Sequence, residues 1–154
     1  MPSDEPLRIG DVRPGSHLGW LYETEDEYRE VLVPFVREGF SRSEKVFCIV
    51  DPHVTEAILG SLRKTGLEVE RYIASGQLTL LTAQEVSTQH GSFSSEAMIA
   101  LLKAETERAR GEGYQALRVT NDMTWAVEGV WSSQRLVEYE HTLNTFVAGS
   151  RCVC

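Results

Sequence analysis

An acidic turn between a strand-like run and a helix-like run is the part of this sequence best suited to chemistry. Residues 15–22, GSHLGWLY, have the composition of a buried strand, and residues 29–40 show helical periodicity. Residues 23–28, ETEDEY, lie between them and contain four carboxylates but no glycine or lysine. A phosphate-binding loop at this place needs glycines, a lysine and a serine or threonine. Because carboxylates repel a polyphosphate, the turn argues against a nucleotide site.

The same turn has a structural and a functional interpretation. Thr24 and Glu27 have the spacing of a capping box, and carboxylates at a helix start are stabilised by the helix dipole. In the functional interpretation the turn shapes a pocket for a neutral or cationic ligand, with Tyr22 and Glu25 among its binding residues. The residues alone leave both interpretations open.

A second candidate site follows the apolar run at residues 117–120. Asp122 occupies the place where a phosphate-loop enzyme would hold the water of its Mg²⁺, a role that has no partner without the loop. Met123 and Trp125 offer polarizable and aromatic surface for a small apolar or methylated compound, although core packing would also use them. Asp51, which ends another apolar run, joins Asp122, Met123 and Trp125 as a candidate ligand-binding residue.

The histidines and cysteines form no recognised metal or catalytic motif. No pair among the four histidines has the spacing of a zinc helix or finger. His17 and Cys152 both begin predicted strands, so they could form a second site at one end of the sheet, with a buried histidine as the alternative. Neither a Gly-x-Ser-x-Gly elbow nor a Ser/His/Asp set occurs. We therefore expect no catalytic residues, no bound metal, no cofactor and no enzymatic activity.

Charge and composition disfavour several classes of partner. The chain of 154 residues carries a net charge of -8, which argues against direct nucleic-acid binding and against anionic membranes. No apolar run approaches the roughly 18 residues of a transmembrane helix, and the polar start is unlike a signal peptide. Three cysteines, an odd number, fit a reducing compartment. We expect a cytoplasmic protein.

Strand-like and helix-like runs alternate through the remaining sequence. After a polar lead-in at residues 1–14, strands are expected at 15–22, 44–51, 77–82, 117–120 and 151–154, and helices at 29–40, from Pro52 to Gly66, 96–110 and 135–147. This alternation predicts a single α/β domain over residues 15–154, with a mostly parallel five-stranded sheet covered by helices on both faces, in three layers. Asp51 is expected to cap the helix that Pro52 opens. Ligand sites in such sheets lie beyond the carboxyl ends of the strands.

Several segments together resemble one known family. They are residues 15–22, 25–28, 34–39, 44–46, 50–51, 75–78, 91–93, 98–99, 118–119, 123–126 and 139–144. Their order and spacing are similar to those of the MEDS family, the methanogen/methylotroph DcmR-type sensory domains, over nearly the whole chain after the lead-in. The family positions matched here are His17, Tyr22, Asp51, Trp125, Glu140 and Cys152.

The resemblance implies a fold related to RecA- and KaiC-type ATPases whose phosphate loop is degenerate. It implies a sensory role in prokaryotic signal transduction, for simple hydrocarbon derivatives. The leading hypothesis is therefore a non-catalytic small-molecule sensing domain in bacterial signal transduction or transcription regulation. Its ligand would be a simple hydrocarbon or one-carbon derivative, and a kinase, anti-sigma or transcription-regulator module would detect the change.

Two other classes of function stay open at this point. One is a degenerate ATPase-like nucleotide binder, in which Asp122 is the metal residue. The other is a protein-interaction module of an anti-sigma or kinase pathway, which docks through the acidic residues Glu23, Glu25 and Asp26. The sequence leaves the oligomeric state open as well.

Overall fold

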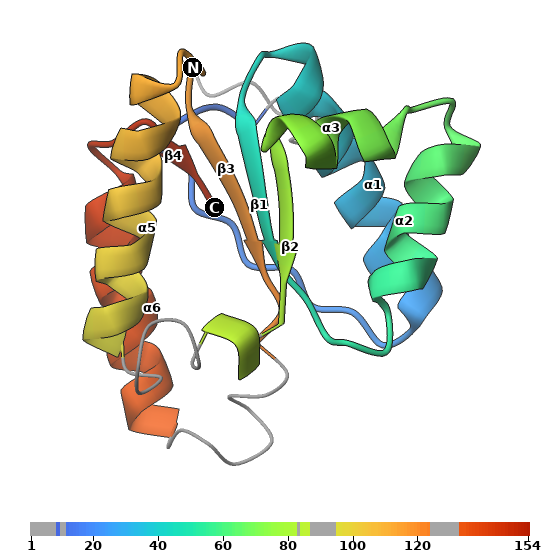
Figure 1. Cartoon of the computed structure of the whole chain (residues 1–154). Helices are drawn as coiled ribbons and strands as arrows, with labels where there is room; N and C mark the ends of the chain where they lie inside the picture. Colours follow the sequence, from blue (N-terminus) through green and yellow to red (C-terminus); the bar gives the residue numbers. More distant parts are fainter. Residues whose placement is uncertain (1–8, 10–11, 83, 87–94, 124–132) are drawn as a thin grey trace, which may run out of the picture.

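A parallel β-sheet lies between two groups of helices in the computed structural model (Figure 1). The structure describes residues 9, 12–82, 84–86, 95–123 and 133–154. Trp125 and most of the lead-in at residues 1–14 lie outside the described residues. The predicted α/β fold with a parallel sheet and helices is confirmed.

The sheet has four strands in the order β2-β1-β3-β4, and each neighbouring pair is parallel. The strands are β1 (Lys45–Ile49), β2 (Leu78–Leu81), β3 (Leu117–Asn121) and β4 (Cys152–Val153). The chain proceeds from β1 outward to β2 and then returns across β1 to β3. The carboxyl ends of β1 and β3 therefore form the topological switch point, where α/β folds place their ligand sites.

Helices cover both faces of this sheet (Figure 1). They are α1 (Glu25–Ser41), α2 (Thr55–Lys64), α3 (Val69–Ser75), α5 (Ser95–Gly111) and α6 (Ser133–Val147). Because side chains of a strand alternate between faces, Val46 and Cys48 pack with α1, α2 and α3, whereas Phe47 and Ile49 pack with α5 and α6. All five residues of β1 are buried, as expected for the centre of a covered parallel sheet.

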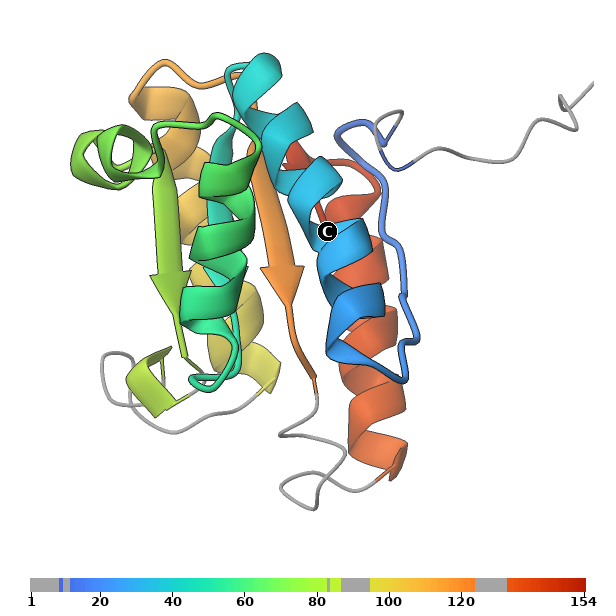
Figure 2. The ribbon, with the colours of Figure 1, turned by 90° about the vertical axis from the view of Figure 1, so that its right-hand side faces the viewer.

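The predicted five-stranded sheet is wrong, because residues 15–22 do not form a strand. These residues, called the edge segment below, run along the outer side of β4 (Figure 2). Gly15 N and Leu18 N donate to the carbonyls of Cys152 and Cys154, and Cys154 N donates to the carbonyl of Ser16. These hydrogen bonds involve the first half of the edge segment, residues 15–18.

The segment after β1 also differs from the sequence prediction. Asp51 was expected to cap a helix beginning at Pro52, but α2 begins at Thr55 with Val54 in the capping position. The Asp51 carboxylate instead accepts a 2.8 Å hydrogen bond from His53 N within a turn. The short helix α3 was not predicted, because its seven residues are too few to show a periodic apolar pattern.

The acidic turn before α1 is a well-formed helix start. The Thr24 side chain accepts from Glu27 N, and the Glu27 carboxylate accepts from Thr24 N, which completes the predicted capping box. Three acidic residues in the first turn of α1 lie where the helix dipole favours negative charge. The acidic turn therefore fixes where α1 begins and the direction in which residues 22 and 23 approach it.

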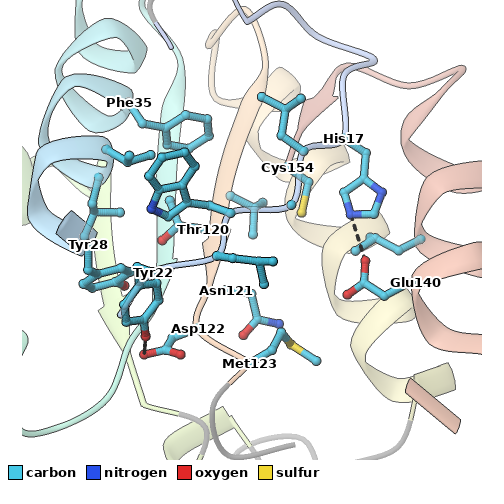
Figure 3. A pocket seen from close by; sticks show the side chains of 18 of the residues that line it. His17, Tyr22, Tyr28, Phe35, Thr120, Asn121, Asp122, Met123, Glu140 and Cys154 are labelled. Carbon is cyan, nitrogen blue, oxygen red and sulfur yellow. Dashed lines mark hydrogen bonds and ion pairs between the residues drawn. The ribbon is translucent and has the colours of Figure 1, made fainter. Parts of the chain in front are cut away.

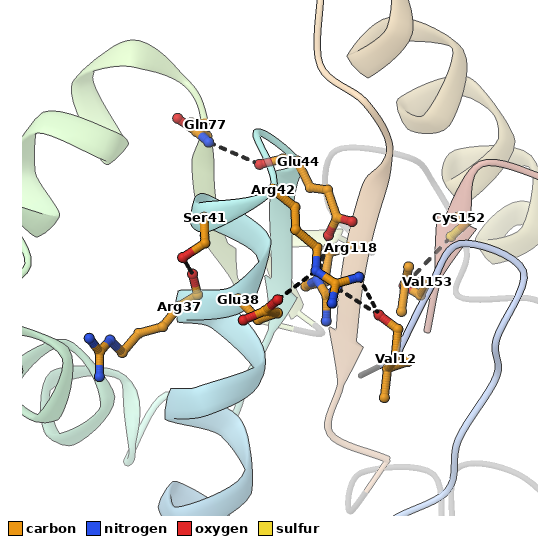
Figure 4. A network of polar contacts seen from close by, with 10 residues as sticks. All are labelled: Val12, Arg37, Glu38, Ser41, Arg42, Glu44, Gln77, Arg118, Cys152 and Val153. Atoms are coloured by element: carbon orange, nitrogen blue, oxygen red, sulfur yellow. Dashed lines mark hydrogen bonds and ion pairs between the residues drawn. The ribbon is translucent and has the colours of Figure 1, made fainter. Parts of the chain in front are cut away.

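A buried ion pair joins β3 to the residue that precedes β1 (Figure 4). Arg118 of β3 donates to the Glu44 carboxylate at 2.5 Å, with the two side chains 0% and 2% exposed. Arg118 also donates to the carbonyl of Val12 at 3.0 Å, and its guanidinium lies 4.6 Å from the ring centre of Phe35 on α1. Arg118 therefore joins the lead-in, α1 and β3 at the amino end of the sheet.

Candidate ligand-binding site

A pocket of about 520 Å³ lies beside the carboxyl half of β3. The edge segment forms the wall opposite β3, and α1 and α6 form the other two walls (Figure 3). Apolar and aromatic side chains of the two helices cover most of these walls: Tyr28, Leu32 and Phe35 of α1, and Leu136, Tyr139 and Leu143 of α6. The volume is within the range of small-molecule sites.

The pocket lies next to the part of β3 that follows its pairing with β4. Strand β3 pairs with β1 as far as Asn121, but it pairs with β4 only at Leu117 and Arg118. Next to the remaining residues of β3, no described strand fills the space between α1 and α6. The pocket therefore lies at the edge of the sheet and opens towards its carboxyl end, next to the switch point.

One polar wall of the pocket is formed by Tyr22 and Asp122. The Tyr22 hydroxyl donates to the Asp122 carboxylate at 3.1 Å, and the Tyr22 ring lies 4.8 Å from that of Tyr28 (Figure 3). The capped start of α1 positions Tyr22, and the end of β3 positions Asp122, whose backbone N–H is fixed by the carbonyl of Ile49. The hydrogen bond between Tyr22 and Asp122 therefore fixes the end of the edge segment that leads into α1.

The other polar wall is an ion pair between the edge segment and α6. Nε2 of His17 lies 3.1 Å from a carboxylate oxygen of Glu140, and the His17 side chain is largely buried (Figure 3). The hydrogen bond with Glu140 raises the pKa of His17 above its usual value, partly opposed by burial. His17 therefore keeps its positive charge at a higher pH than an exposed histidine, and it holds the segment against α6.

The phenol and thiol groups in the pocket wall are neutral hydrogen-bonding groups. Burial raises the pKa of both Tyr28 and Tyr139 far above the usual value for a phenol. Burial likewise raises the pKa of the Cys154 thiol well above its usual range. At neutral pH the wall therefore offers hydroxyl and thiol groups, without a thiolate nucleophile.

The charged groups in the pocket wall are mostly acidic. Asp122 and Glu140 contribute carboxylates, and His17 is the one basic side chain among the described lining residues, which include no lysine or arginine. The side-chain amide of Asn121 lies between the two polar walls (Figure 3). In the described part of the chain, no group of three or more His, Cys, Asp or Glu side chains is placed to hold a metal ion.

The structure brings together some of the residues predicted from sequence and separates others. Tyr22, Asp122 and Met123 line the pocket. Asp51 forms its own turn outside the pocket, and Glu25 is exposed in the first turn of α1. Trp125 lies outside the described residues.

The proposed pair of His17 and Cys152 takes a different form in the structure. Cys152 is fully buried in the core, and burial raises the pKa of its thiol to about 12. It does not line the pocket, whereas His17 and Cys154 both do. The Cys152 thiol therefore lies in the core and outside the pocket wall that contains His17.

Sequence reasoning missed the contribution of the two helices. Tyr28, Leu32 and Phe35 recur at helical spacing on α1, and Leu136, Tyr139 and Leu143 recur in the same way on α6. This spacing was visible in the sequence, but it does not distinguish a pocket wall from a packed core. Glu140 was matched by resemblance alone, and its partner His17 became apparent only in the structure.

Comparisons with known proteins give one family and one curated relative. The family model described as MEDS, MEthanogen/methylotroph, DcmR Sensory domain, matches residues 16–154. A curated protein of Methylorubrum extorquens, named Transcriptional repressor DcmR, is 27% identical over 134 residues, which cover 87% of this chain and 48% of the relative. The chain therefore spans about half the length of the curated relative it matches. No solved structure matches the chain. In the described residues, no helix has the length and apolar character needed to cross a membrane.

Proposed function

Because this chain belongs to the MEDS family of methanogen/methylotroph DcmR sensory domains, we propose that it is a non-catalytic sensing domain that binds a small apolar ligand in the pocket beside β3. The bound compound is uncharged or cationic, and a simple hydrocarbon or one-carbon derivative fits this description. The domain passes the bound state to a regulatory partner, in keeping with the name of its relative as a transcriptional repressor.

The observation that carries this proposal is the lining of the pocket. Its surface is largely apolar, and its carboxylates come from Asp122 and Glu140. A carboxylate or phosphate ligand would be repelled by both groups, whereas a neutral or ammonium compound would not. The acid–base groups are also engaged with one another, Tyr22 with Asp122 and His17 with Glu140, which supports binding rather than catalysis.

The acidic turn bears on the relation of this fold to nucleotide-binding proteins. A relation to RecA- and KaiC-type ATPases with a lost phosphate loop is part of the proposal, supported by the switch point between β1 and β3 and by the capping box that replaces the loop. The acidic turn and the acidic pocket argue against retained polyphosphate binding. Calorimetry with ATP and Mg²⁺ tests this point, and micromolar binding would contradict it.

The ligand proposal is tested with N-phenyl-1-naphthylamine, a neutral probe whose fluorescence rises in apolar sites. The chain should bind this probe, and 1-hexanol and hexylamine should displace it. Hexanoate, which has the same chain length and a negative charge, should displace it about tenfold less well or worse, a difference of about 1.4 kcal/mol. Equal displacement by all three compounds would show that the two carboxylates do not select the ligand.

A matched pair of variants locates the bound probe. Leu136→Trp enlarges a partly buried side chain in the pocket wall and should abolish probe binding. Leu67→Trp makes the same change at a partly buried leucine of the opposite core cluster and should leave binding unchanged. If Leu136→Trp is folded by circular dichroism and still binds the probe with full affinity, the pocket is not the ligand site.

A further inference from the structure

Two tyrosines and an aspartate form one corner of the pocket, called the tyrosine corner below. Tyr22 and Tyr28 have ring centres 4.8 Å apart, and the Tyr22 hydroxyl donates to the Asp122 carboxylate at 3.1 Å. The three side chains lie together, across the pocket from Glu140 (Figure 3). Because Asp122 N donates to the carbonyl of Ile49, the corner lies at the carboxyl ends of β1 and β3, where α/β folds bind their ligands.

The Tyr28 hydroxyl is a buried group whose capacity for hydrogen bonding is unused within the described part of the chain. Tyr28 is 8% exposed, and its hydroxyl oxygen forms no hydrogen bond with any described residue. Burial of a polar group without a partner costs free energy. Since Tyr28 lines the pocket, a ligand that donates to this oxygen would recover part of that cost.

The electrostatic field at the Tyr28 hydroxyl favours a positive charge. Burial raises the pKa of Tyr28 far above the usual value for a phenol, and the negative charges of Asp122 and Asp51 raise it further. A field that opposes the formation of a phenolate stabilises a cation at the same place. The first turn of α1 adds three carboxylates, which outweigh the positive end of the helix dipole, about half a unit charge.

The remaining lining of the pocket suits an organic cation. The rings of Trp20, Tyr22 and Tyr28 all line the pocket, and the face of an aromatic ring attracts an ammonium group. A small inorganic cation would leave most of the apolar volume of about 520 Å³ unfilled, whereas the hydrocarbon chain of an alkylammonium would occupy it.

We propose that the tyrosine corner binds the ammonium group of a primary alkylamine, whose apolar chain extends between α1 and α6. The N–H groups of this ligand donate to the Asp122 carboxylate and to the Tyr28 hydroxyl oxygen. A carboxylate accepts about four hydrogen bonds, so Asp122 binds the ammonium group while it keeps its bond from Tyr22. This site rests on the proposed function and narrows its ligand from neutral or cationic compounds to alkylammonium ions.

Competition for bound N-phenyl-1-naphthylamine at neutral pH tests the preference for an ammonium group. Hexylamine, which is protonated at this pH, should displace the probe at a concentration about tenfold lower, or lower still, than 1-hexanol of the same chain length. Hexyltrimethylammonium carries the charge without an N–H donor and should need a concentration between the two. If 1-hexanol displaces the probe as well as hexylamine does, the ammonium site is wrong.

Two variants that each remove one negative charge show whether the preference comes from Asp122. Asp122→Asn keeps an oxygen that accepts from Tyr22, so probe affinity should be unchanged, but the required hexylamine concentration should rise about tenfold, to that of 1-hexanol. Glu30→Gln, at an exposed position of α1 outside the pocket, should leave the preference intact. Equal losses in the two variants would assign the preference to the net charge of the chain and overturn the site.

A third variant tests the hydrogen bond to Tyr28. Tyr28→Phe should weaken hexylamine about three- to tenfold and leave hexyltrimethylammonium unchanged, because that compound has no N–H to donate. Tyr72→Phe, in the stack with Phe40 outside the pocket, should affect neither compound. If Tyr28→Phe weakens both compounds equally, Tyr28 accepts no hydrogen bond from the ligand and this part of the site is wrong.

The ammonium site and the proposed function fail in different ways. If the probe binds and hexylamine and 1-hexanol displace it equally, the proposed function stands and the ammonium site fails. If no probe binds, calorimetry with hexylamine decides: binding that is lost in Asp122→Asn supports the site, and the absence of binding overturns both proposals.

Discussion

The Tyr22 hydroxyl donates a 3.1 Å hydrogen bond to the carboxylate of Asp122, a residue 100 positions later in the chain. This bond joins the far end of the edge segment to the carboxyl end of β3 and forms one polar wall of the pocket. Tyr22→Phe should therefore lower the free energy of unfolding by about 0.5–1.5 kcal/mol in urea denaturation. It should also weaken binding of N-phenyl-1-naphthylamine, because the pocket wall loses its anchor.

A second tyrosine supplies the control for this variant. Tyr72 stacks on Phe40 with ring centres 4.0 Å apart, on the opposite face of the sheet from α6. Tyr72→Phe retains this stacking and should leave probe affinity unchanged. If Tyr22→Phe and Tyr72→Phe behave alike in both measurements, the Tyr22–Asp122 bond does not hold the wall.

The His17–Glu140 pair predicts a dependence of stability on pH. Because Glu140 raises the pKa of folded His17 above its unfolded value of about 6.5, the folded chain binds this proton more tightly. The contribution is fully present below about pH 6.5 and is lost as the pH rises through the higher folded pKa. Unfolding free energies measured from pH 5 to 9, together with an NMR titration of His17, check this sign.

Glu140→Gln removes the charge but keeps the length of the side chain. The pKa of His17 should fall, and the stability that the pair adds at low pH should disappear. A His17 titration that is unchanged in Glu140→Gln would assign the raised pKa to another group.

Two helical glycines predict opposite effects of the same substitution. A Cβ atom at Gly39 of α1 would lie 2.8 Å from both Cδ of Arg118 and Cγ2 of Val46, whereas one at Gly60 of α2 would have no neighbour within 4 Å. Gly39→Ala should therefore destabilise the chain by about 1–3 kcal/mol through overpacking. Gly60→Ala should stabilise it by about 0.5–1 kcal/mol, because alanine favours the helix. Thermal or urea unfolding of the two variants measures the sign of each change in the free energy of unfolding.

Most of the fold could be predicted from local sequence signals. Strand-like runs that include Val46–Ile49 and Leu78–Leu81 alternate with periodic helices, and this alternation has few solutions other than a covered parallel sheet. The capping box at Thr24 and Glu27 is equally local, since both partners lie within one helical turn. Signals of this kind do not depend on which distant segments meet.

The failures occurred where the answer depends on distant partners. The composition of residues 15–22 favours a strand, yet strand formation needs a neighbour, and this segment bonds to residues 152–154 through Gly15, Ser16 and Leu18. In the same way, apolar spacing on α1 and α6 identifies a buried face, but not that the two faces enclose a pocket. His17 and Glu140 are paired across 123 positions, a distance that local patterns do not encode.

The buried pair of Arg118 and Glu44 predicts the largest single loss of stability. Glu44→Gln keeps the shape of the side chain but leaves the Arg118 charge buried without a counterion, which costs about 3–5 kcal/mol. Urea unfolding of the purified variant measures this loss. Replacing both residues, with Glu44→Leu and Arg118→Met, should recover a large part of it, since no charge is then buried.

An exposed ion pair tests whether burial causes the loss of stability in Glu44→Gln. Glu68 lies 3.6 Å from Arg71, and both side chains are at least 75% exposed, so water already solvates each charge. Glu68→Gln should therefore leave the free energy of unfolding without a resolvable change. If Glu44→Gln costs no more than Glu68→Gln, then the Arg118 charge does not depend on Glu44 in the folded chain. If Glu44→Gln strongly lowers the free energy of unfolding and the double replacement recovers it, the uncompensated charge of Arg118, rather than a lost contact, destabilises the single variant.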